Sequence, residues 1–524
     1  MAASANPSSG GGGQVNPSVR SSASTQMLVR TQMIRAVYGG TETMRVQGKA
    51  FLPQYEKEST KRYDARLAST FALNKTREAV DAASAKPFKT LVTVSNGDPD
   101  LDLWIKDIDL SGNHLHIFGH TFFNDAMLVG QGHLLADHPT TTNMPNLAAQ
   151  KASGVRPFLK HIKDENLLAA YSERVGGDQM VLHARIASSR VQRNPDFTET
   201  IMNQVFVLEV EPGAEVGIVQ LWEQPASSGG SQWTLMGESP LTMNEVPLVS
   251  LLAGEKEADL VTRPIFLDLA YKQIEHWISS SDQRSILSAA RFPMLAASGV
   301  EIDPEDESGF AIGPFKVLYS PDAQGRWYYV EPAGRAIESG FKDLSMLEMQ
   351  MDMMALNPVT GTHRQYVPQN ERDIQETRVH SVVHDVAIAC RDTLQKAIQF
   401  MGRWTNKDYS NVVVNMNADF TNTADKVKQV ALLLQAYEKR GISRETFLTE
   451  ARNLDFLSDD FDPVAEMARL AITDAMDLAA EGNDVEPVGG GDGPIAGSKD
   501  DPVRKTTTAP VDFPNGQSRP TRQI

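Results

Sequence analysis

Cysteine is almost absent: Cys390 is the single one among 524 residues. One cysteine excludes an intramolecular disulfide and any metal site built from several cysteines. Cys390 lies on the apolar stripe of a predicted helix, and free cysteine at such a position behaves as a small apolar residue. We therefore expect an inert core thiol and not a nucleophile.

Long apolar runs are missing as well. No window approaches the roughly 18 consecutive apolar residues that a membrane-spanning helix needs. The N-terminus is rich in Ala, Ser, Gly and Asn and has no apolar segment of the kind found in secretory signals. We expect a cytosolic, soluble product with no membrane partner.

Positive charge is in short supply. The chain has 50 Lys and Arg against 67 Asp and Glu, a formal net charge of -17. Proteins that hold nucleic acid by neutralising phosphates usually show the opposite balance. If DNA is a partner, it is not held by a broad basic surface. A negatively charged wall would instead repel phosphates and let DNA slide past, which is our hypothesis for the acidic balance.

What is present is an ordinary globular composition, with 41% hydrophobic and 22% charged residues. The length is too great for one core, so two to four domains are expected. Residues 1–25 and 482–524 are poor in large apolar residues, and we expect both to be disordered tails.

Residues 26–262 read as an α+β region. Alternating apolar and polar residues predict strands, and a proline suited to the first position of a helix predicts one helix. The expected elements are a helix within Tyr55–Glu78, a strand at His114–Phe118, a helix at Pro157–Ala170, and strands at Gln179–Ile186, Gln204–Val210 and Val216–Trp222.

The chain changes character near Pro264, where helical periodicity begins. The predicted elements are helices at 263–293, 339–356 and 373–404, a hairpin of Phe315–Tyr319 with Trp327–Val330, a polar loop at 357–372, and shorter helices within 405–481 with caps at Ser443 and Asp462. Two long helices flanking a small β insertion cannot bury both faces alone. Neighbouring copies in a ring would cover them; the alternative is packing on the chain's own α+β region.

Five of the 11 histidines lie between His114 and His138. On a strand, His114 and His116 would share one face and, with His120 and His133, could bind zinc. The alternative is a region that happens to be rich in histidine. No motif nearby supplies the general base of a hydrolytic metal centre, so we assign no metal ligand.

Two further patterns have simple structural explanations. Asp98, Asp100 and Asp102 resemble the start of a calcium loop, but Leu103 stands where the loop needs glycine. A solvated turn explains them better. The run Met346, Met349, Met351, Met353 and Met354 is typical of a core or helix–helix contact, where flexible methionine fills gaps. We find no catalytic motif and expect no catalytic residue and no cofactor.

A series of short strings, in order over about residues 35–470, resembles a branch of the portal proteins of tailed bacteriophages long catalogued only as a domain of unknown function. The strings are Tyr38-Gly39-Gly40, Phe51-Leu52-Pro53-Gln54, Asp107–Gly112, Gly130–His133, Ala136–Pro139, Arg156–Leu159, Asp268–Tyr271, Glu275-His276, Ser279–Asp282, Arg291–Pro293, Tyr329–Gly334, Glu376-Thr377, Asn417–Phe420 and Gly441–Thr446. The chain departs from the family at Asn357-Pro358-Val359, where relatives tend to be more apolar and rich in glycine.

The resemblance implies a portal-like α+β fold and a ring of probably 12 copies at one capsid vertex of a virion assembled in the bacterial cytoplasm. The implied parts are a wing at 26–262, stem helices at 263–293 and 339–356, a clip at 294–338, a tunnel loop at 357–372, a long kinked helix at 373–404, and a crown at 405–481.

The resemblance also implies partners. They are the large terminase subunit, head-completion or adaptor proteins, the major capsid and scaffolding proteins, and double-stranded DNA contacted without sequence specificity. His363 and Arg364 would lie near DNA in the tunnel loop. Asp303, Glu305, Asp306 and Glu307 would be either a solvated loop or part of the surface of the clip that faces the terminase. The alternatives are another head or adaptor protein, or a hydrolase using the histidine cluster.

Overall fold

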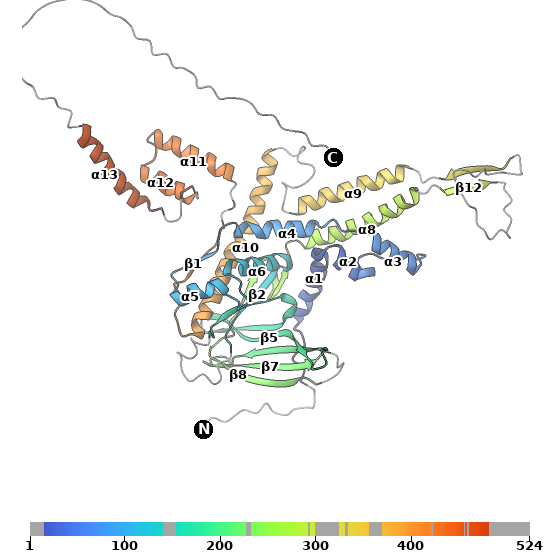
Figure 1. Ribbon diagram of the computed structural model, residues 1–524, viewed down its shortest axis with the longest axis horizontal. Coiled ribbons are helices and arrows are strands. Elements are labelled where there is room, and N and C mark those ends of the chain that lie inside the picture. The colour runs from blue at the N-terminus through green and yellow to red at the C-terminus, as the bar shows by residue number, and fades with distance from the viewer. Residues whose placement is uncertain are drawn as a thin grey trace, which may run out of the picture. The chain divides into compact units, whose positions relative to one another are not determined.

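The computed structural model describes residues 15–139, 154–226, 232–291, 294–298, 324–330, 334–355, 369–418, 420, 423–454, 456–457 and 461–481. The chain divides into two compact units, Met1–Thr421 and Asn422–Ile524. Helices and strands are mixed in the first unit, which confirms the expected α+β class (Figure 1). Among the described residues, no helix is both long enough and apolar enough to cross a membrane.

Helices dominate the N-terminal part of the first unit. They are α1 (Ser22–Gly39), α2 (Thr41–Gln47), η1 (Gly48–Ala50), α3 (Thr60–Ser69), α4 (Lys75–Ala85), η2 (Lys86–Phe88), α5 (Pro99–Trp104), η3 (Ile105–Asp107) and α6 (Leu115–Val129). Helix α1 begins inside the predicted disordered tail. The Ser21 side chain caps it by accepting from the Ser24 amide, and Met27, Ile34 and Val37 are buried.

Two predictions in this part were wrong. The helix expected within Tyr55–Glu78 is two helices, α3 and α4, each with its own cap at Ser59 and Asn74. The strand expected at His114–Phe118 is the start of α6, where the His114 side chain is the N-cap. The residues of α6 that are not buried, among them Ile117, Thr121 and Asn124, follow one narrow face. At the start of the helix, Leu115, His116 and Ile117 alternate apolar and polar residues as a strand does.

Three strands in the order β3-β2-β9 form a small antiparallel sheet. They are β2 (Gln131–Asp137), β3 (Phe158–Ile162) and β9 (Leu248–Leu252). Together with β4 (Leu167–Val175) and η4 (Asp164–Asn166), β3 replaces the helix predicted at Pro157–Ala170. Leu159 and Ile162 are three residues apart, as on a helix face, but pairing with β2 places both in the core.

A second antiparallel sheet has five strands in sequence order, β4-β5-β6-β7-β8. The remaining strands are β5 (Asp178–Arg193), β6 (Glu199–Glu209), β7 (Gly217–Pro225) and β8 (Thr234–Leu241). They confirm the three strands predicted between 179 and 222. Alternate residues Leu182, Ala184 and Ile186 of β5 are buried, as the period of two requires.

Three long helices follow the sheets. They are α8 (Leu267–Ala290), α9 (Gly334–Met354) and α10 (Gln369–Trp404), near the predicted bounds. Helix α9 starts five residues before the predicted position, and α10 includes the last four residues of the predicted loop at 357–372. Helix α10 packs on β2 and β9, and its residues Leu394, Ile398 and Met401 are buried there.

Short strands complete the first unit. Strand β1 (Thr93–Ser95) pairs with β14 (Val413–Asn415), and β10 (Glu255–Ala258) pairs with β11 (Val261–Arg263). Strand β13 (Arg326–Val330) confirms the strand predicted at Trp327–Val330. Its partner is β12 (Met294–Ser298) and not Phe315–Tyr319, which lies outside the described residues.

The second unit contains α11 (Thr423–Glu438), α12 (Arg444–Asn453) and α13 (Pro463–Glu481). The predicted caps are confirmed. The Ser443 side chain accepts from the Thr446 amide at the start of α12, and the Asp462 carboxylate accepts from the Val464 amide at the start of α13.

Candidate functional site: a helix pair that carries a β hairpin

Helices α8 and α9 lie side by side and antiparallel, with the β12–β13 hairpin between the end of one and the start of the other (Figure 1). Leu347 and Met351 of α9 and Trp277 of α8 are buried. Apolar burial of this kind holds the pair together independently of the chain that connects the two helices.

Polar contacts fix the register of the pair. The Gln283 amide donates to the Ile337 carbonyl at 2.9 Å, and His276 Nε2 lies 3.4 Å from Glu348 Oε1. A Cβ on Gly340 would come within 2.0 Å of the Gln283 amide oxygen, so glycine permits the close approach. At the far end of α9, Lys75 of α4 forms a 2.9 Å ion pair with Asp352. The pair is therefore anchored to the helical part of the first unit.

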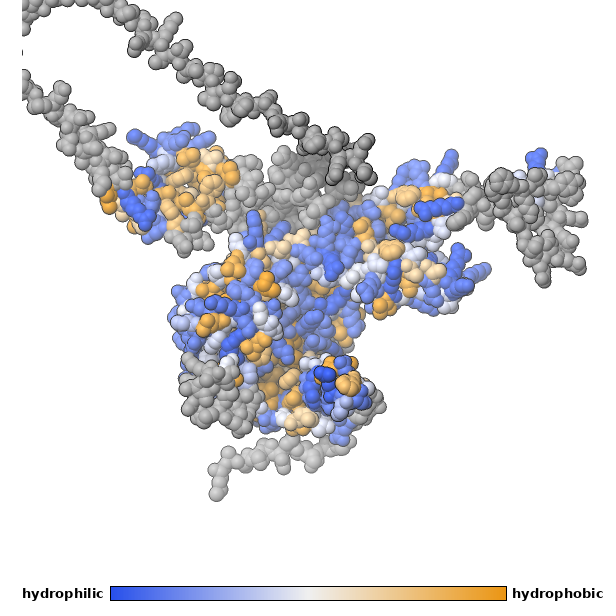
Figure 2. Space-filling model, viewed as in Figure 1, coloured by the Kyte–Doolittle hydropathy of each residue, from blue (hydrophilic) through white to orange (hydrophobic). Residues whose placement is uncertain are grey.

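The face of α9 turned away from α8 is unusually apolar for an exposed surface. Met346, Met349 and Met353 are 57%, 41% and 65% exposed, although their spacing places them along one stripe. Only Met351 of the methionine run is fully buried. In Figure 2 the surface over α8 and α9 shows hydrophobic patches between hydrophilic ones. Met354 is also exposed, at 40%. A place in the core is therefore confirmed for Met351 and wrong for the other four methionines of the run.

A groove of about 660 Å³ lies beside the pair, lined by residues of α3, α8 and α9. Four arginines line it: Arg62, Arg66, Arg284 and Arg291. Arg66 is buried and forms a two-pronged ion pair with Glu58, at 2.9 and 2.8 Å. The sequence analysis missed these arginines, although the spacing of four between Arg62 and Arg66 and of seven between Arg284 and Arg291 places each pair on one helix face.

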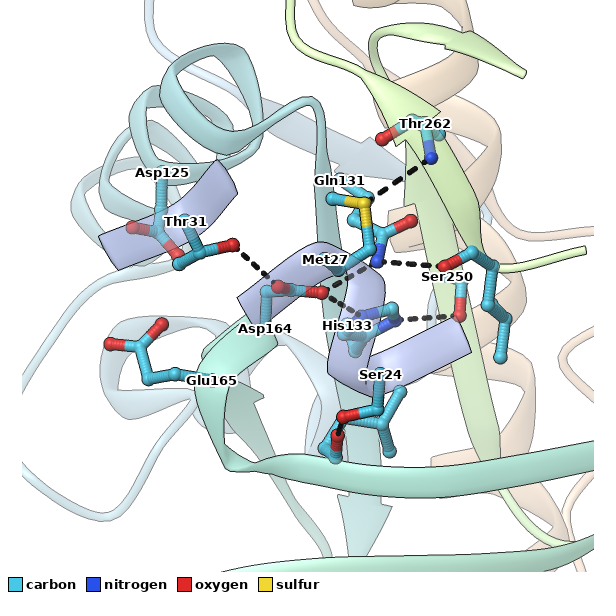
Figure 3. A network of polar contacts seen from close by, with 12 residues as sticks. Ser24, Met27, Thr31, Asp125, Gln131, His133, Asp164, Glu165, Ser250 and Thr262 are labelled. Atoms are coloured by element: carbon cyan, nitrogen blue, oxygen red, sulfur yellow. Dashed lines mark hydrogen bonds and ion pairs between the residues drawn. The ribbon is translucent and has the colours of Figure 1, made fainter. Parts of the chain in front are cut away.

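A buried polar network joins α1, β2, η4 and β9 (Figure 3). His133 Nδ1 lies 2.8 Å from Ser250 Oγ, and His133 Nε2 lies 3.7 Å from Asp164 Oδ1. The Asp164 carboxylate also accepts from Gln131 at 2.5 Å and from Thr31 at 2.7 Å. Burial would raise the pKa of Asp164, but contacts with His133, Gln131 and Thr31 outweigh it and lower that pKa.

Ser250, His133 and Asp164 are the residue types of a hydrolase triad, but they do not have the geometry that a triad needs. The distance from His133 to Asp164 exceeds hydrogen-bonding range, and His133 is fully buried. A general base must reach the proton that it abstracts, and a side chain without exposure cannot meet a substrate. The network links α1, β2, η4 and β9, and His133 is not placed to act as a general base.

A second cluster lies next to this network. Arg35 of α1 forms a 2.6 Å ion pair with Asp125 of α6 and a 3.0 Å ion pair with Glu165. His161 Nε2 of β3 lies 3.3 Å from the second oxygen of Asp125. These contacts connect α1, α6 and the small sheet through charges that are largely shielded from water.

The four histidines considered as zinc ligands are divided between two places in the fold. His116 and His120 of α6 pack against Phe88 of η2, whereas His133 of β2 belongs to the buried network. In the part of the chain that the structure describes, no three His, Cys, Asp or Glu side chains are grouped to hold a metal ion.

The aspartates that resemble a calcium loop have other partners. Asp98 caps α5 by accepting from the Leu101 amide at 2.8 Å, and it accepts from Tyr409 at 2.9 Å. Lys407 pairs with both Asp98 and Asp100, the latter at 2.7 Å. These contacts tie α5 to the segment after α10, so the solvated turn that we predicted is instead a structural link.

The remaining predicted site residues can be placed briefly. Cys390 is buried, as predicted, and burial raises the pKa of its thiol. His363 and Arg364 lie outside the described residues, as do Asp303, Glu305, Asp306 and Glu307.

Residues 265–405 match a family described as "Domain of unknown function (DUF4055)". The match covers less than half of the chain, and its bounds enclose α8, the hairpin, α9 and α10. No curated protein matches the chain.

The chain is similar to several solved structures. One is a chain of the "Virion of native gene transfer agent (GTA) particle", at 12% identity and a TM-score of 0.38, covering 79% of this chain and 98% of that one. Another is from the "Neck of empty GTA particle computed with C6 symmetry", at 10% identity and 0.37, covering 73% and 90%. A third, from the "Neck of native GTA particle computed with C12 symmetry", is at 10% and 0.39, covering 72% and 89%.

Proposed function

We propose that this chain is the portal subunit of a tailed bacteriophage, a structural ring protein at one capsid vertex through which double-stranded DNA enters and leaves. The observation that carries the proposal is the antiparallel pair α8–α9 with the β12–β13 hairpin at its end, followed by the long helix α10. The ordered strings that resemble portal proteins support it, and the family match at 265–405 falls on this same stretch.

Exposed apolar groups support assembly into a ring. Met346 and Met353 of α9 and Tyr271 of α8 are each more than half exposed on helices that pack with their other faces. Soluble monomers rarely expose large apolar patches, and such patches often mark sites of interaction with another protein. In a closed ring, neighbouring copies of the same subunit would cover these groups. The resemblance to portal proteins implies 12 copies.

Each part receives a role under this proposal. Residues 26–262 are the wing, α8 and α9 the stem, the segment containing β12 and β13 the clip, α10 the long helix behind the tunnel loop, and α11 to α13 the crown. The clip would dock the large terminase subunit and later the head-completion proteins, with Asp303, Glu305, Asp306 and Glu307 in that surface. The capsid and scaffolding proteins would surround the ring in the virion.

The contact with DNA is proposed to be weak and independent of sequence. The net charge of -17 would keep phosphates from settling on the channel wall. His363 and Arg364 of the tunnel loop are proposed as the basic groups nearest to DNA. The chain is proposed to have no enzymatic activity of its own.

Negative-stain electron microscopy of the purified full-length protein tests the proposal. We expect ring particles with about twelvefold symmetry, as closed assemblies of identical subunits require. Monomers that persist at high protein concentration and low salt would contradict it.

A further inference from the structure

The groove beside α8 is lined by four arginines, although the chain as a whole carries a net charge of -17. Among its four arginines, Arg66 pairs with the carboxylate of Glu58. Within the described residues, Arg62, Arg284 and Arg291 form no ion pair, and all three side chains are exposed. The Arg284 guanidinium stacks on Phe71, 5.4 Å from the ring centre, which holds it at the groove.

The lining also includes hydroxyl and apolar groups. Serines 69, 280, 285 and 288 add donors, and Phe341 of α9, half exposed, adds an apolar surface. The groove therefore fits a surface that combines carboxylates with apolar or aromatic side chains.

Such a surface exists on the opposite side of α8. Glu275 precedes Arg284 by nine residues, which places the two about 180° apart around the helix. Tyr271, one turn before Glu275, and Ile286, three turns after it, lie on this outer side and are 57% and 37% exposed. Asp268 lies there too, at the start of the helix. We call Asp268, Tyr271, Glu275 and Ile286 the outer stripe.

The carboxylates of the outer stripe are available to another molecule. Asp268 pairs with Arg263 and Glu275 pairs with Lys272, each at 2.8 Å, but both carboxylates are more than half exposed. Exposed ion pairs of this kind contribute only about 0–1 kcal/mol, so exchanging a partner costs little.

We propose that the arginine groove of one copy receives the outer stripe of α8 of the next copy. This inference rests on the proposed ring and names the surfaces that would close it. Two different, complementary surfaces on opposite sides of one helix make a head-to-tail contact, and repeating that contact generates a ring where the rotation closes. Asp268 and Glu275 meet Arg284 and Arg291, which share their spacing of seven residues. Tyr271, between the two carboxylates, meets Phe341.

Nucleic acid is the other polyanion that the groove could attract, and the structure favours it less. The part of α8 that lines the groove, Ser280 to Arg291, spans only about 17 Å. Glu58 lies beside it on Arg66, and Phe341 offers an apolar surface that phosphates do not need. A matching partner surface on the same helix makes a second copy the occupant.

Mixing two full-length variants with reversed charge tests the contact. The groove variant carries Arg284→Glu and Arg291→Glu, and the stripe variant carries Asp268→Lys and Glu275→Lys. Each alone sets like charges against each other at every contact, so we expect at least about tenfold fewer rings by electron microscopy and sedimentation. The mixture restores opposite charges at every contact, and alternating rings should form. Lys61→Glu, on the exposed surface of α3 outside the groove, is the matched control and should assemble like the unaltered chain.

The outcomes separate the inference from the proposed function. Rings from the mixture and from neither variant alone support the inference, and also show that both variants fold. Rings from the groove variant alone would overturn it and leave the portal proposal standing. Failure of the mixture to assemble would overturn it as well, provided that the unaltered chain forms rings. Unchanged rings with loss of binding to a DNA duplex would assign the groove to nucleic acid. Absence of rings from the unaltered chain would remove both proposals.

Discussion

Asp125 connects α6 to helix α1 and strand β3 through its two carboxylate oxygens. It is a buried carboxylate on α6, facing Arg35 of α1 and His161 of β3. Burial alone would raise its pKa, but the His161 ring and the Arg35 guanidinium outweigh burial and lower the pKa to about 2. The ionised form is therefore favoured by folding.

Replacing this carboxylate should destabilise the protein in a pH-dependent way. A pKa below the ordinary value contributes stability that is complete above about pH 4 and is lost as the pH falls toward 2. We expect Asp125→Asn to lower the free energy of unfolding by about 2 kcal/mol at pH 7, and by progressively less below pH 4. Thermal unfolding followed by circular dichroism from pH 7 to pH 3 measures this. The exposed Asp64→Asn is the control, and an equal loss at every pH would contradict the assignment.

For single residues, the sequence predicts burial better than it predicts which distant side chain a residue contacts. Cys390 was predicted to be buried because its helical register is visible in the sequence. Lys407 as the partner of Asp98 was not predictable, since 309 residues separate them and only folding brings them together. The arginine groove was missed for the same reason: Arg62 and Arg284 come from helices whose adjacency the sequence does not state.

The helix pair allows an element-scale prediction, because two methionines of α9 differ in environment. Met351 is fully buried, whereas Met353 is 65% exposed. Truncation of a buried methionine removes apolar contact and leaves a cavity, so we expect Met351→Ala to cost about 2–4 kcal/mol. Met353→Ala should change the free energy of unfolding by less than about 0.5 kcal/mol. Chemical denaturation of both variants measures the free energy of unfolding. An equal decrease for both variants would contradict the difference in burial between Met351 and Met353.

Elements with one clear periodicity were predicted well, and buried elements were not. The long helices α8, α9 and α10 have one apolar face each, and the strands from β5 to β7 alternate, so their patterns are distinct. Helix α6 has only a narrow face that is not buried, and the alternation of Leu115, His116 and Ile117 was read as a strand. Pro157 suggested a helix start, but pairing of Asp137 with Phe158 and of Ala136 with Leu159 made the segment a strand. Tertiary pairing overrode the local preference there.

At the scale of the whole molecule, the β12–β13 hairpin can be removed with the least effect on the packing of the helices. Strand β12 pairs with β13, and the packing of α8 on α9 comes from contacts such as Gln283 with Ile337 and His276 with Glu348. Those contacts lie on the helices themselves. The hairpin can therefore be exchanged without removing what holds the pair together.

Replacing residues 292–333 with a flexible Gly/Ser linker should separate ring formation from docking of the packaging motor. Because the α8–α9 contacts and the arginine groove remain, we expect rings in the same amount as for the unaltered chain. Because the proposed docking surface is gone, the large terminase subunit should no longer sediment with the rings. A linker variant that keeps residues 294–298 and 324–330 as a shortened hairpin controls for the change in length. Binding of terminase to rings that lack the whole segment would place the docking surface elsewhere. Loss of rings in the variant without the hairpin, with rings kept in the variant that retains its strands, would show that the hairpin itself contributes to the contact between copies.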